Sequence, residues 1–368
     1  MKRKVIIIFI IFMFTYLPCK KINGSCESAY FIEKETNQVL YEHNADEVLP
    51  MASTTKIMTA IIALEVGDLG KTLTVSDFAS RTEGSSMYLR VGDRLTLYDA
   101  ICGTLLLSGN DASVVVAEGV SGSVEDFTVL MNEKAKALGC ENTSFMNPHG
   151  LDEDGHHTTA RELCKIASYA MENEVFREIV SSKSMLLTVN GEKSTYYNKD
   201  KFLSLYEHSI GIKNGYTELA GRCFVSGATD CGYTVYGVVL NADHMYNNSI
   251  EITKNIYEKY EMVELARKGD YIGEIKVKET DLSYQLYYDE DVKVLKERGS
   301  ADVYLKCELK KEVSLPVDYD EGVGKIIVTT DNEVLYEREI TTNYSLQKKK
   351  STFEKLIEIF KLCICEMF

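Results

Sequence analysis

One short segment, PMASTTKIMTA at residues 50–60, decides the fold of this chain. Apolar residues recur at helical spacing from Ile57 onward, and Pro50 stops the segment before them, so the sequence predicts a buried helix with Ser53 at its start. Residues three apart on a helix share one face. The spacing therefore places the Ser53 hydroxyl and the Lys56 amine within reach of each other.

Two further short motifs, called strings here like Ser-x-x-Lys, indicate what this segment does. Ser-Gly-Asn at residues 108–110 and Lys-Asn-Gly at residues 213–215 follow it in chain order. Alone, a Ser-x-x-Lys string occurs about once or twice by chance in a chain of this composition, and Ser345 with Lys348 is an example. The three strings together form a set that performs acyl transfer. Their order and context indicate a serine acyl-enzyme.

The chemistry needs a base beside the serine, and the sequence supplies a candidate. A serine hydroxyl is a poor nucleophile until a base removes its proton, and a lysine is a base only when it is neutral. Burial, the positive end of the helix and a second cation at Lys213 would all lower the pKa of Lys56. We expect Ser108 to relay the proton toward the leaving group, and Asn110 to bind the substrate amide and to fix Lys56.

The third string is predicted to lie on a strand of a sheet. Residues 223–240 have the composition of two strands around a turn, and Lys213 precedes them. On this strand, Gly215 would leave the surface open for a peptide. The backbone N–H of Tyr216, together with that of Ser53, would then form an oxyanion hole.

Each string also has an ordinary structural interpretation. Ser53 could simply be a residue at the N-terminus of a helix. Residues 108–110 have the composition of a turn, and Lys213 could be a solvated lysine on a strand. The functional interpretation fails only if all three ordinary interpretations hold at once.

A polar loop at residues 148–157 offers an alternative kind of site, one that binds a metal ion. The side chains with metal-ligand chemistry are His149, Asp152, Asp154, His156 and His157. Their spacing matches neither His-Glu-x-x-His nor a calcium-binding loop. We therefore interpret the segment as a polar loop that borders the active site, and we expect neither a metal ion nor another cofactor.

The N-terminus has the pattern of an export signal. Basic residues at positions 2–4 precede an apolar run at residues 5–17, which is too short to span a bilayer comfortably. We expect residues 1–25 to be a signal peptide and the protein to be exported. The ten cysteines are scattered, without a Cys-x-x-Cys pair, so we expect most of them, such as Cys102 and Cys223, to be small buried side chains.

The net charge excludes one class of partner. It is −15 for the whole chain, and because residues 1–25 hold five basic residues and no acidic one, their removal would make it −20. Such an acidic chain repels phosphodiester backbones, and no basic patch with interleaved aromatic residues offsets this charge. Nucleic acid is therefore not an expected partner.

The change in residue patterns along the sequence predicts a catalytic domain at residues 26–262, a second domain at 263–345 and a tail at 346–368. The first alternates helical and strand-like patterns, as in an α/β or α+β fold. The second has short β-rich segments between charged turns, which indicates a small all-β sandwich. In the tail, apolar residues share one helical face and charges interrupt every long apolar run, which predicts an amphipathic helix on a membrane surface.

With these residues in hand, the chain resembles the low-molecular-mass penicillin-binding proteins that act as serine-type D-alanyl-D-alanine carboxypeptidases, peptidase family S11. The likeness extends beyond the three strings to further blocks, and it covers nearly all of residues 29–257. The blocks are residues 50–60, 83–87, 107–112, 147–151, 158–161, 215–217 and 220–221. The β-rich domain and the amphipathic tail also match the layout of that family.

The resemblance implies a penicillin-recognising serine transpeptidase fold, which is also the β-lactamase-like fold. It implies removal of the terminal D-alanine from peptidoglycan stem pentapeptides at the outer face of the cytoplasmic membrane, with β-lactams as inhibitors. Carried over by position, Ser53 is the nucleophile, Lys56 is the general base, and Ser108 and Asn110 relay the proton and position the substrate. The implied substrate-binding residues are Lys213, Asn214, Gly215, Tyr216 and Thr217.

One position departs from the family pattern. The third string of the family normally has threonine between its lysine and its glycine, whereas this chain has Asn214. Because of this departure, a second hypothesis remains: the chain is a catalytically impaired homologue that binds peptidoglycan or acts in morphogenesis. A class A β-lactamase shares the three strings, but it would need a positioned deacylating glutamate and would lack the C-terminal β domain and the tail.

Overall fold

The structure is a computed structural model that describes residues 25–278, 280–331, 333–342 and 345. The chain divides into two compact units, Met1–Tyr257 and Glu258–Phe368. The division therefore lies slightly before the boundary that the sequence suggests at residue 262. The predicted signal peptide and the predicted amphipathic tail lie outside the described residues. Among those residues, no helix is both long enough and apolar enough to cross a membrane.

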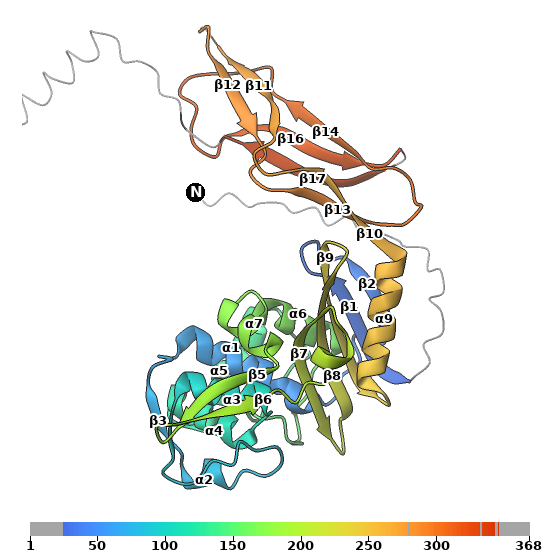
Figure 1. The fold of residues 1–368 in the computed structure, drawn as a ribbon. Coiled ribbons are helices and arrows are strands. Elements are labelled where there is room, and N and C mark those ends of the chain that lie inside the picture. Colours follow the sequence, from blue (N-terminus) through green and yellow to red (C-terminus); the bar gives the residue numbers. More distant parts are fainter. Residues whose placement is uncertain (1–24, 279, 332, 343–344, 346–368) are drawn as a thin grey trace, which may run out of the picture. The chain divides into compact units, whose positions relative to one another are not determined.

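A five-stranded antiparallel sheet forms the centre of the first unit (Figure 1), with the strand order β2-β1-β9-β8-β7. Its strands are β1 (Cys26–Glu33), β2 (Val39–His43), β7 (Ser209–Thr217), β8 (Gly221–Asp230) and β9 (Tyr233–Ala242). The predicted pair of strands at residues 223–240 is confirmed as β8 and β9. The third string lies on β7, which forms one edge of the same sheet.

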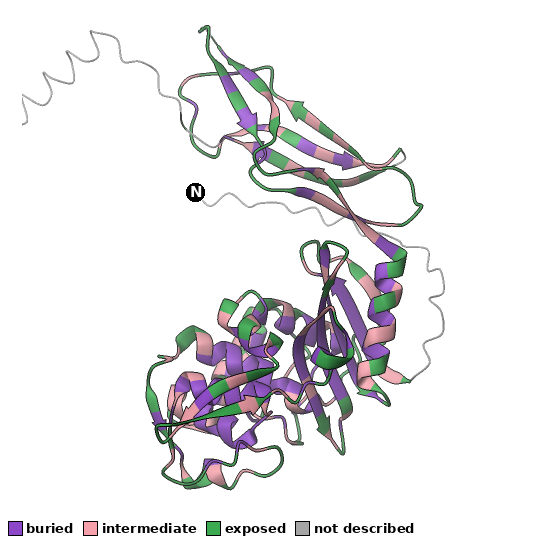
Figure 2. Ribbon diagram, in the orientation of Figure 1, coloured by how far each residue is buried: buried purple, intermediate pink, exposed green. Residues whose placement is uncertain are grey.

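Helices cover both faces of this sheet. On one face, Tyr246 of α9 (Met245–Lys259) packs against Phe224 of β8, with ring centroids 5.0 Å apart. On the other face, Val225 joins a core shared with α6 (Ala160–Ala170), which contacts β1 and β9. Because both faces are covered, β8 and β9 are buried along most of their length (Figure 2).

Helix α1 (Lys56–Val66) is preceded by a 3₁₀ turn, η1 (Ala52–Thr55). Every residue of α1 from Lys56 to Ala63 is buried, as expected for a helix that is apolar on nearly all sides. Further helices of this unit are α2 (Asp77–Ser80), α3 (Leu97–Leu106), α4 (Asn110–Ser121), α5 (Val124–Ala137), α7 (Glu174–Ser181) and α8 (Phe202–Leu205). Of these, α3, α4, α5 and α7 contact α1, while α2 contacts α4 and α8 contacts β7. Cys102 and Cys223 are fully buried in this unit, as the sequence predicts.

Two short antiparallel strand pairs complete the first unit. One pairs β3 (Thr72–Thr74) with β4 (Arg94–Thr96), and the other is the hairpin of β5 (Ser184–Val189) and β6 (Glu192–Tyr197). Strand β4 leads directly into α3, where the Thr96 side chain accepts a hydrogen bond from the Asp99 backbone N–H and so caps the helix.

The second unit is all-β in its described part. Its strands are β10 (Tyr260–Ala266), β11 (Tyr271–Val277), β12 (Ser283–Tyr287), β13 (Val292–Glu297), β14 (Tyr304–Leu309), β15 (Glu312–Val313), β16 (Gly322–Thr329) and β17 (Val334–Thr341). Two three-stranded sheets, β12-β11-β15 and β14-β16-β17, contribute side chains such as Ile275 and Ile326 to one core. Buried and exposed residues alternate along β12. This is the layout of a small sandwich.

Candidate active site

Ser53 lies in the 3₁₀ turn η1, and α1 begins only at Lys56. The sequence predicts Ser53 at the start of the helix, but the helix is entered through this tighter turn. Residues three apart still lie on one side of a 3₁₀ turn, so the predicted pairing holds. The preceding residue, Ala52, has a φ of 48°, a left-handed conformation that costs a non-glycine residue about 1–2 kcal/mol. Backbone strain is therefore placed next to the candidate nucleophile.

Lys56 is fully buried, and its amine has three oxygen partners. The Nζ atom lies 2.8 Å from Ser53 Oγ, 2.7 Å from Asn110 Oδ1 and 2.5 Å from the carbonyl oxygen of His149. Burial lowers the pKa of Lys56 well below its usual range, and the nearby cation Lys213 lowers it further. The predicted serine–lysine pair is thus present, with an amine that favours the neutral form.

Asn110 is the first residue of α4, and its amide bridges two parts of the site. While Oδ1 accepts from Lys56, Nδ2 donates to the carbonyl oxygen of Glu83 at 2.6 Å. The backbone N–H of Asn110 donates to the Ser85 carbonyl oxygen at 2.7 Å. A Cβ atom on Gly84 would lie 2.7 Å from Asn110 Nδ2. The loop at residues 83–89 therefore rests directly on the amide that holds Lys56.

Asp111 anchors the same loop, a function that the sequence did not suggest. Its carboxylate accepts hydrogen bonds from the Ser86 hydroxyl at 2.7 Å and from the backbone N–H groups of Met87 at 2.9 Å and Leu89 at 3.1 Å. The carboxylate is buried, so these donors replace water around its charge. The start of α4 therefore holds the loop at two successive stretches, residues 83–85 through Asn110 and residues 86–89 through Asp111.

Ser108 lies in the connection between α3 and α4, and it is buried. Its φ is 57°, a second left-handed non-glycine residue within the candidate site. The Ser108 hydroxyl has no hydrogen-bond partner among the residues that the structure describes. The hydroxyl is therefore available for a ligand contact or a proton relay, and the predicted role of Ser108 stays a prediction.

Lys213 is only 1% exposed on β7, and no carboxylate of the described chain lies in ion-pair contact with it. Its Nζ donates to the Asn214 carbonyl oxygen at 2.9 Å and lies 3.5 Å from Asn214 Oδ1. Burial lowers the pKa of Lys213 to about 7; Asp200 opposes this shift and Lys199 adds to it. Burial likewise raises the pKa of the Asp200 carboxyl to about 6. Lys213 is thus poised near neutral pH to gain a proton when an anion binds.

Gly215 allows close packing in the structure, which differs from the open strand surface that the sequence suggests. The sequence predicts an open strand surface at this glycine, but β7 packs closely against η1. A Cβ atom on Gly215 would lie 2.7 Å from the Ser53 backbone nitrogen and 3.0 Å from Ala52 Cβ. The glycine therefore lets the strand approach the nucleophile, and the backbone of β7 forms one wall of the site.

Comparisons with known proteins agree with this geometry. The sequence model of the D-alanyl-D-alanine carboxypeptidase family, peptidase S11, matches residues 19–244. The chain is 31% identical over 334 residues to the D-alanyl-D-alanine carboxypeptidase DacF of Bacillus subtilis, covering 88% of this chain and 86% of that protein.

The chain belongs to peptidase family S11. It is therefore a serine-type peptidase. The chain is also 30% identical over 362 residues to the D-alanyl-D-alanine carboxypeptidase DacA of Escherichia coli, covering 93% of this chain and 88% of that protein. The C-terminal domain model of penicillin-binding protein 5 matches residues 260–349, which include most of the second unit.

Solved structures with the same fold confirm the predicted architecture. Penicillin-binding protein 5 of Haemophilus influenzae has a TM-score of 0.74 at 24% identity, covering 90% of this chain and all of that one. A Streptomyces K15 DD-transpeptidase has a TM-score of 0.62 at 31% identity, covering 64% of this chain and 99% of that one. The predicted penicillin-recognising fold followed by a small β sandwich is therefore confirmed.

Tyr216 and Thr217, the two residues that follow the third string, differ in their surroundings. Tyr216 is 61% exposed, and the Arg222 guanidinium lies over its ring at 5.5 Å. The Thr217 hydroxyl donates to Asp152 Oδ1 at 2.6 Å and accepts from the Ala220 N–H at 3.0 Å. Thr217 therefore ties β7 to the 148–157 loop, while Tyr216 offers its ring to solvent.

Three of the five side chains with metal-ligand chemistry in the 148–157 loop, those of His149, Asp152 and His156, take part in hydrogen bonds within the first unit. His149 Nδ1 accepts from the Leu151 N–H at 3.2 Å, and burial lowers the pKa of His149 to about 3. Asp152 accepts from Thr217, as described above. In the part of the chain that the structure covers, no group of three or more His, Cys, Asp or Glu side chains is placed to hold a metal ion.

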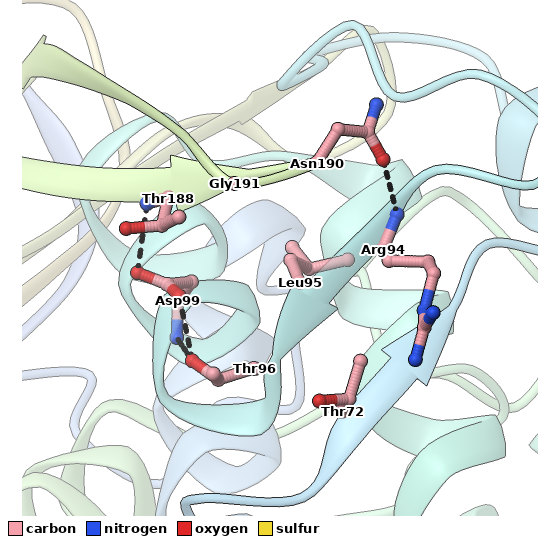
Figure 3. A pocket seen from close by; sticks show the side chains of 8 residues that line it. All are labelled: Thr72, Arg94, Leu95, Thr96, Asp99, Thr188, Asn190 and Gly191. Carbon is pink, nitrogen blue, oxygen red and sulfur yellow. Dashed lines mark hydrogen bonds between the residues drawn. The ribbon is translucent and has the colours of Figure 1, made fainter.

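A cavity of about 410 Å³ lies away from these residues (Figure 3). It opens between the paired strands β3 and β4, the start of α3 and the end of the β5–β6 hairpin. The Arg94 N–H of β4 donates to Asn190 Oδ1 of the β5–β6 turn at 2.8 Å, and the Thr188 N–H of β5 donates to Asp99 Oδ1 of α3 at 3.1 Å. None of the predicted site residues lines this cavity.

Proposed function

We propose that this chain removes the terminal D-alanine from peptidoglycan stem pentapeptides through an acyl-enzyme on Ser53. The observation that carries the proposal is the set of three oxygens around Lys56 Nζ. Asn110 Oδ1 and the His149 carbonyl oxygen can only accept hydrogen bonds, so both take N–H bonds of Lys56. Ser53 Oγ is the third oxygen, 2.8 Å from Nζ, and a charged ammonium would donate to it. Because burial lowers the pKa of Lys56 and so favours the neutral amine, this third direction can instead hold a lone pair that faces the Ser53 hydroxyl as a base.

The acylation step follows from this arrangement. Ser53 Oγ attacks the carbonyl carbon of the penultimate D-alanine, and its proton passes to Lys56. The tetrahedral oxyanion is stabilised by the backbone N–H groups of Ser53 and Tyr216. When the C–N bond breaks, the amine of the terminal D-alanine takes a proton that Lys56 delivers through Ser108. A water molecule then attacks the ester, with Lys56 again as the base, and releases the shortened peptide.

Recognition of the substrate would depend on its terminal carboxylate. Lys213 is a buried cation without an ion-pair partner in the described chain, and a buried charge of this kind is costly until an anion compensates it. Binding of the D-alanine carboxylate provides that compensation. The carboxylate of a β-lactam has the same chemistry, so penicillin would acylate Ser53 from the same position.

We also propose that the protein is exported and acts at the outer face of the cytoplasmic membrane. The support is the basic and apolar pattern of residues 1–25 and the amphipathic pattern of residues 346–368. Both segments suit an enzyme whose substrate lies outside the cytoplasm.

The test of the proposed reaction is acylation of the purified protein by penicillin, followed by peptide mass spectrometry, with D-alanine release from a pentapeptide measured in parallel. We expect the penicillin mass on the peptide that contains Ser53, and loss of both adduct and release in Ser53→Ala. Ser345→Ala is the matched control, because it removes the serine of the second Ser-x-x-Lys string and should change nothing. A full adduct on the Ser53→Ala protein would contradict the proposal.

A further inference from the structure

The peptide bond between Ala52 and Ser53 is held by a chain of hydrogen bonds that starts on the 148–157 loop. Ala52 is buried and has a φ of 48°. Its carbonyl oxygen accepts from the Thr55 hydroxyl at 2.8 Å. The Thr55 oxygen, in turn, lies 2.7 Å from Nε2 of His156, a residue far from it in sequence and only 6% exposed.

The direction of this chain follows from the partners of the imidazole. His156 Nδ1 accepts a hydrogen bond from the Met146 backbone N–H at 3.0 Å, so Nδ1 carries no proton. A neutral ring must then have its proton on Nε2, which donates to Thr55 Oγ1. The Thr55 hydroxyl can therefore give its own proton to the Ala52 carbonyl oxygen.

The surroundings of the ring favour its neutral form. Burial, first of all, lowers the pKa of His156 to about 4, with His157 and Lys56 acting in the same direction and Asp152 against them. Phe145 packs against the ring edge to face, with centroids 5.9 Å apart. The tautomer deduced above is thus the favoured form of the ring.

The same loop also covers the Ala52 carbonyl directly. Gly150 has a φ of 84°, and a Cβ atom there would lie 2.0 Å from the Ala52 oxygen and 2.8 Å from Thr55 Oγ1. No side chain larger than hydrogen fits at this point. The carbonyl is therefore enclosed by the Thr55 hydroxyl and the Gly150 backbone, and it has no room to turn.

We propose that His156 is a positioning residue for acyl transfer: acting through Thr55, it fixes the Ala52–Ser53 peptide plane and so aims the Ser53 N–H at the oxyanion. A peptide unit is planar, so an anchored carbonyl fixes the N–H on the other side of the same bond. That N–H points where charge develops in the transition state, where donor placement has its largest effect on rate. The inference rests on the proposed function, because it assigns an oxyanion donor.

Three single variants and one double variant test this role in the full chain. His156→Phe keeps an aromatic ring but removes both of its hydrogen bonds, and Thr55→Val removes the hydroxyl while keeping the shape. We expect each to slow acylation by penicillin about ten- to hundredfold with little change in KM for the peptide. The double variant should lose no more than the worse single one, because the two residues act in one chain. His156→Gln keeps a donor and an acceptor, so it should retain most of the rate.

Thr104→Val is the matched control, since the buried Thr104 hydroxyl also donates to a backbone carbonyl, that of Ala100 at 2.9 Å, but outside the site. It should leave acylation unchanged, and thermal unfolding will show whether each variant is folded. If His156→Phe does not fold, Thr55→Val and His156→Gln carry the test. Wild-type acylation in folded His156→Phe or Thr55→Val, additive losses in the double variant, or a His156→Gln as slow as His156→Phe would overturn the inference.

The two proposals fail in different ways. In the variants of His156 and Thr55, penicillin should still label Ser53, only more slowly. Labelling at the wild-type rate removes the positioning role and leaves the proposed function intact. Label found on another residue, or retained in Ser53→Ala, removes the proposed function itself.

Discussion

The Cβ position of Gly215 points at the backbone nitrogen of Ser53 from a distance of 2.7 Å. Real Cβ atoms almost never approach another heavy atom so closely, so strand β7 and turn η1 meet with no space for a methyl group. The contact is between backbone and backbone, and neither partner can give way without moving the nucleophile or the sheet edge.

Gly215→Ala is therefore expected to displace the Ser53 N–H. Because small misplacements of reacting groups are costly, acylation by penicillin should slow by about ten- to hundredfold. Gly70→Ala is the control, since Gly70 is exposed and its nearest contact would be Asp68 Oδ1 at 3.5 Å. Stopped-flow measurement of the acylation rates checks the comparison. Equal rates in both variants would show that η1 can shift to accommodate the methyl group without loss of activity.

Lys56→Arg should be almost inactive. A guanidinium keeps its proton at any pH at which the protein is folded, so it cannot serve as a base. We expect acylation to fall by about 10²–10⁴-fold, the usual contribution of general base catalysis. Lys71→Arg, a lysine that donates to the Gly119 carbonyl oxygen away from the site, should behave as wild type. Near-normal turnover in Lys56→Arg would mean that another group activates Ser53.

The pH dependence of activity should depend on two lysines, one of which must be neutral and the other charged. Lys56 must be neutral, and its lowered pKa favours that form, with activity lost as acid protonates it. Lys213 must be charged, and with a pKa of about 7 it loses its proton as the pH rises through that value. We therefore expect kcat/KM for a pentapeptide to decline on the alkaline side of about pH 7. The decline in kcat should come at higher pH, because bound carboxylate holds the proton on Lys213.

Lys213→Arg provides the check on this assignment. Arginine stays charged, so the alkaline decline in kcat/KM should move to higher pH even if the overall rate is reduced. An unchanged alkaline limb in Lys213→Arg would assign that limb to a different group.

Asn214→Thr tests the departure from the family pattern. Both the backbone and the side-chain oxygen of Asn214 lie close to Lys213 Nζ, so the substitution changes the immediate surroundings of the proposed carboxylate site. We expect KM or the acylation rate to change by up to roughly tenfold, the scale of one hydrogen bond to a charged group. If the wild type forms no penicillin adduct and releases no D-alanine while Asn214→Thr does both, the chain is an impaired homologue.

Deletion of residues 346–368 should move the protein from the membrane to the soluble fraction. The amphipathic pattern of this segment motivates the prediction, and turnover of a soluble pentapeptide should stay the same. Fractionation followed by immunoblotting measures the change. Continued membrane association of the shortened protein would point to an uncleaved N-terminal segment as the anchor.

The sequence predicts the parts of the site that depend on local periodicity. Ser53 and Lys56 were expected on one face because they are three residues apart, and this spacing holds in a 3₁₀ turn as well as in an α-helix. The strand that carries Lys213 was predicted from the apolar pattern of its neighbours, β8 and β9. Both inferences use short stretches of chain, where pattern and structure are directly linked.

The sequence does not predict contacts in which one partner is the backbone. Asp111 holds its loop largely through N–H groups, and His156 acts between the Met146 N–H and a hydroxyl. Backbone groups are the same in every residue, so no residue type marks these partners. The same reason applies to Gly215: the sequence predicts an open surface there, because the backbone that packs against this glycine lies far away in the sequence.

The close packing around the nucleophile limits how this enzyme can evolve. Any substitution of glycine adds at least a methyl group, and at Gly84, Gly150 and Gly215 that group would collide with Asn110, with Ala52 or with Ser53. Substitutions at these three glycines therefore cannot change sensitivity to β-lactams without disturbing the catalytic residues. Substitutions at positions with exposed side chains can, and the exposed ring of Tyr216 is one such position.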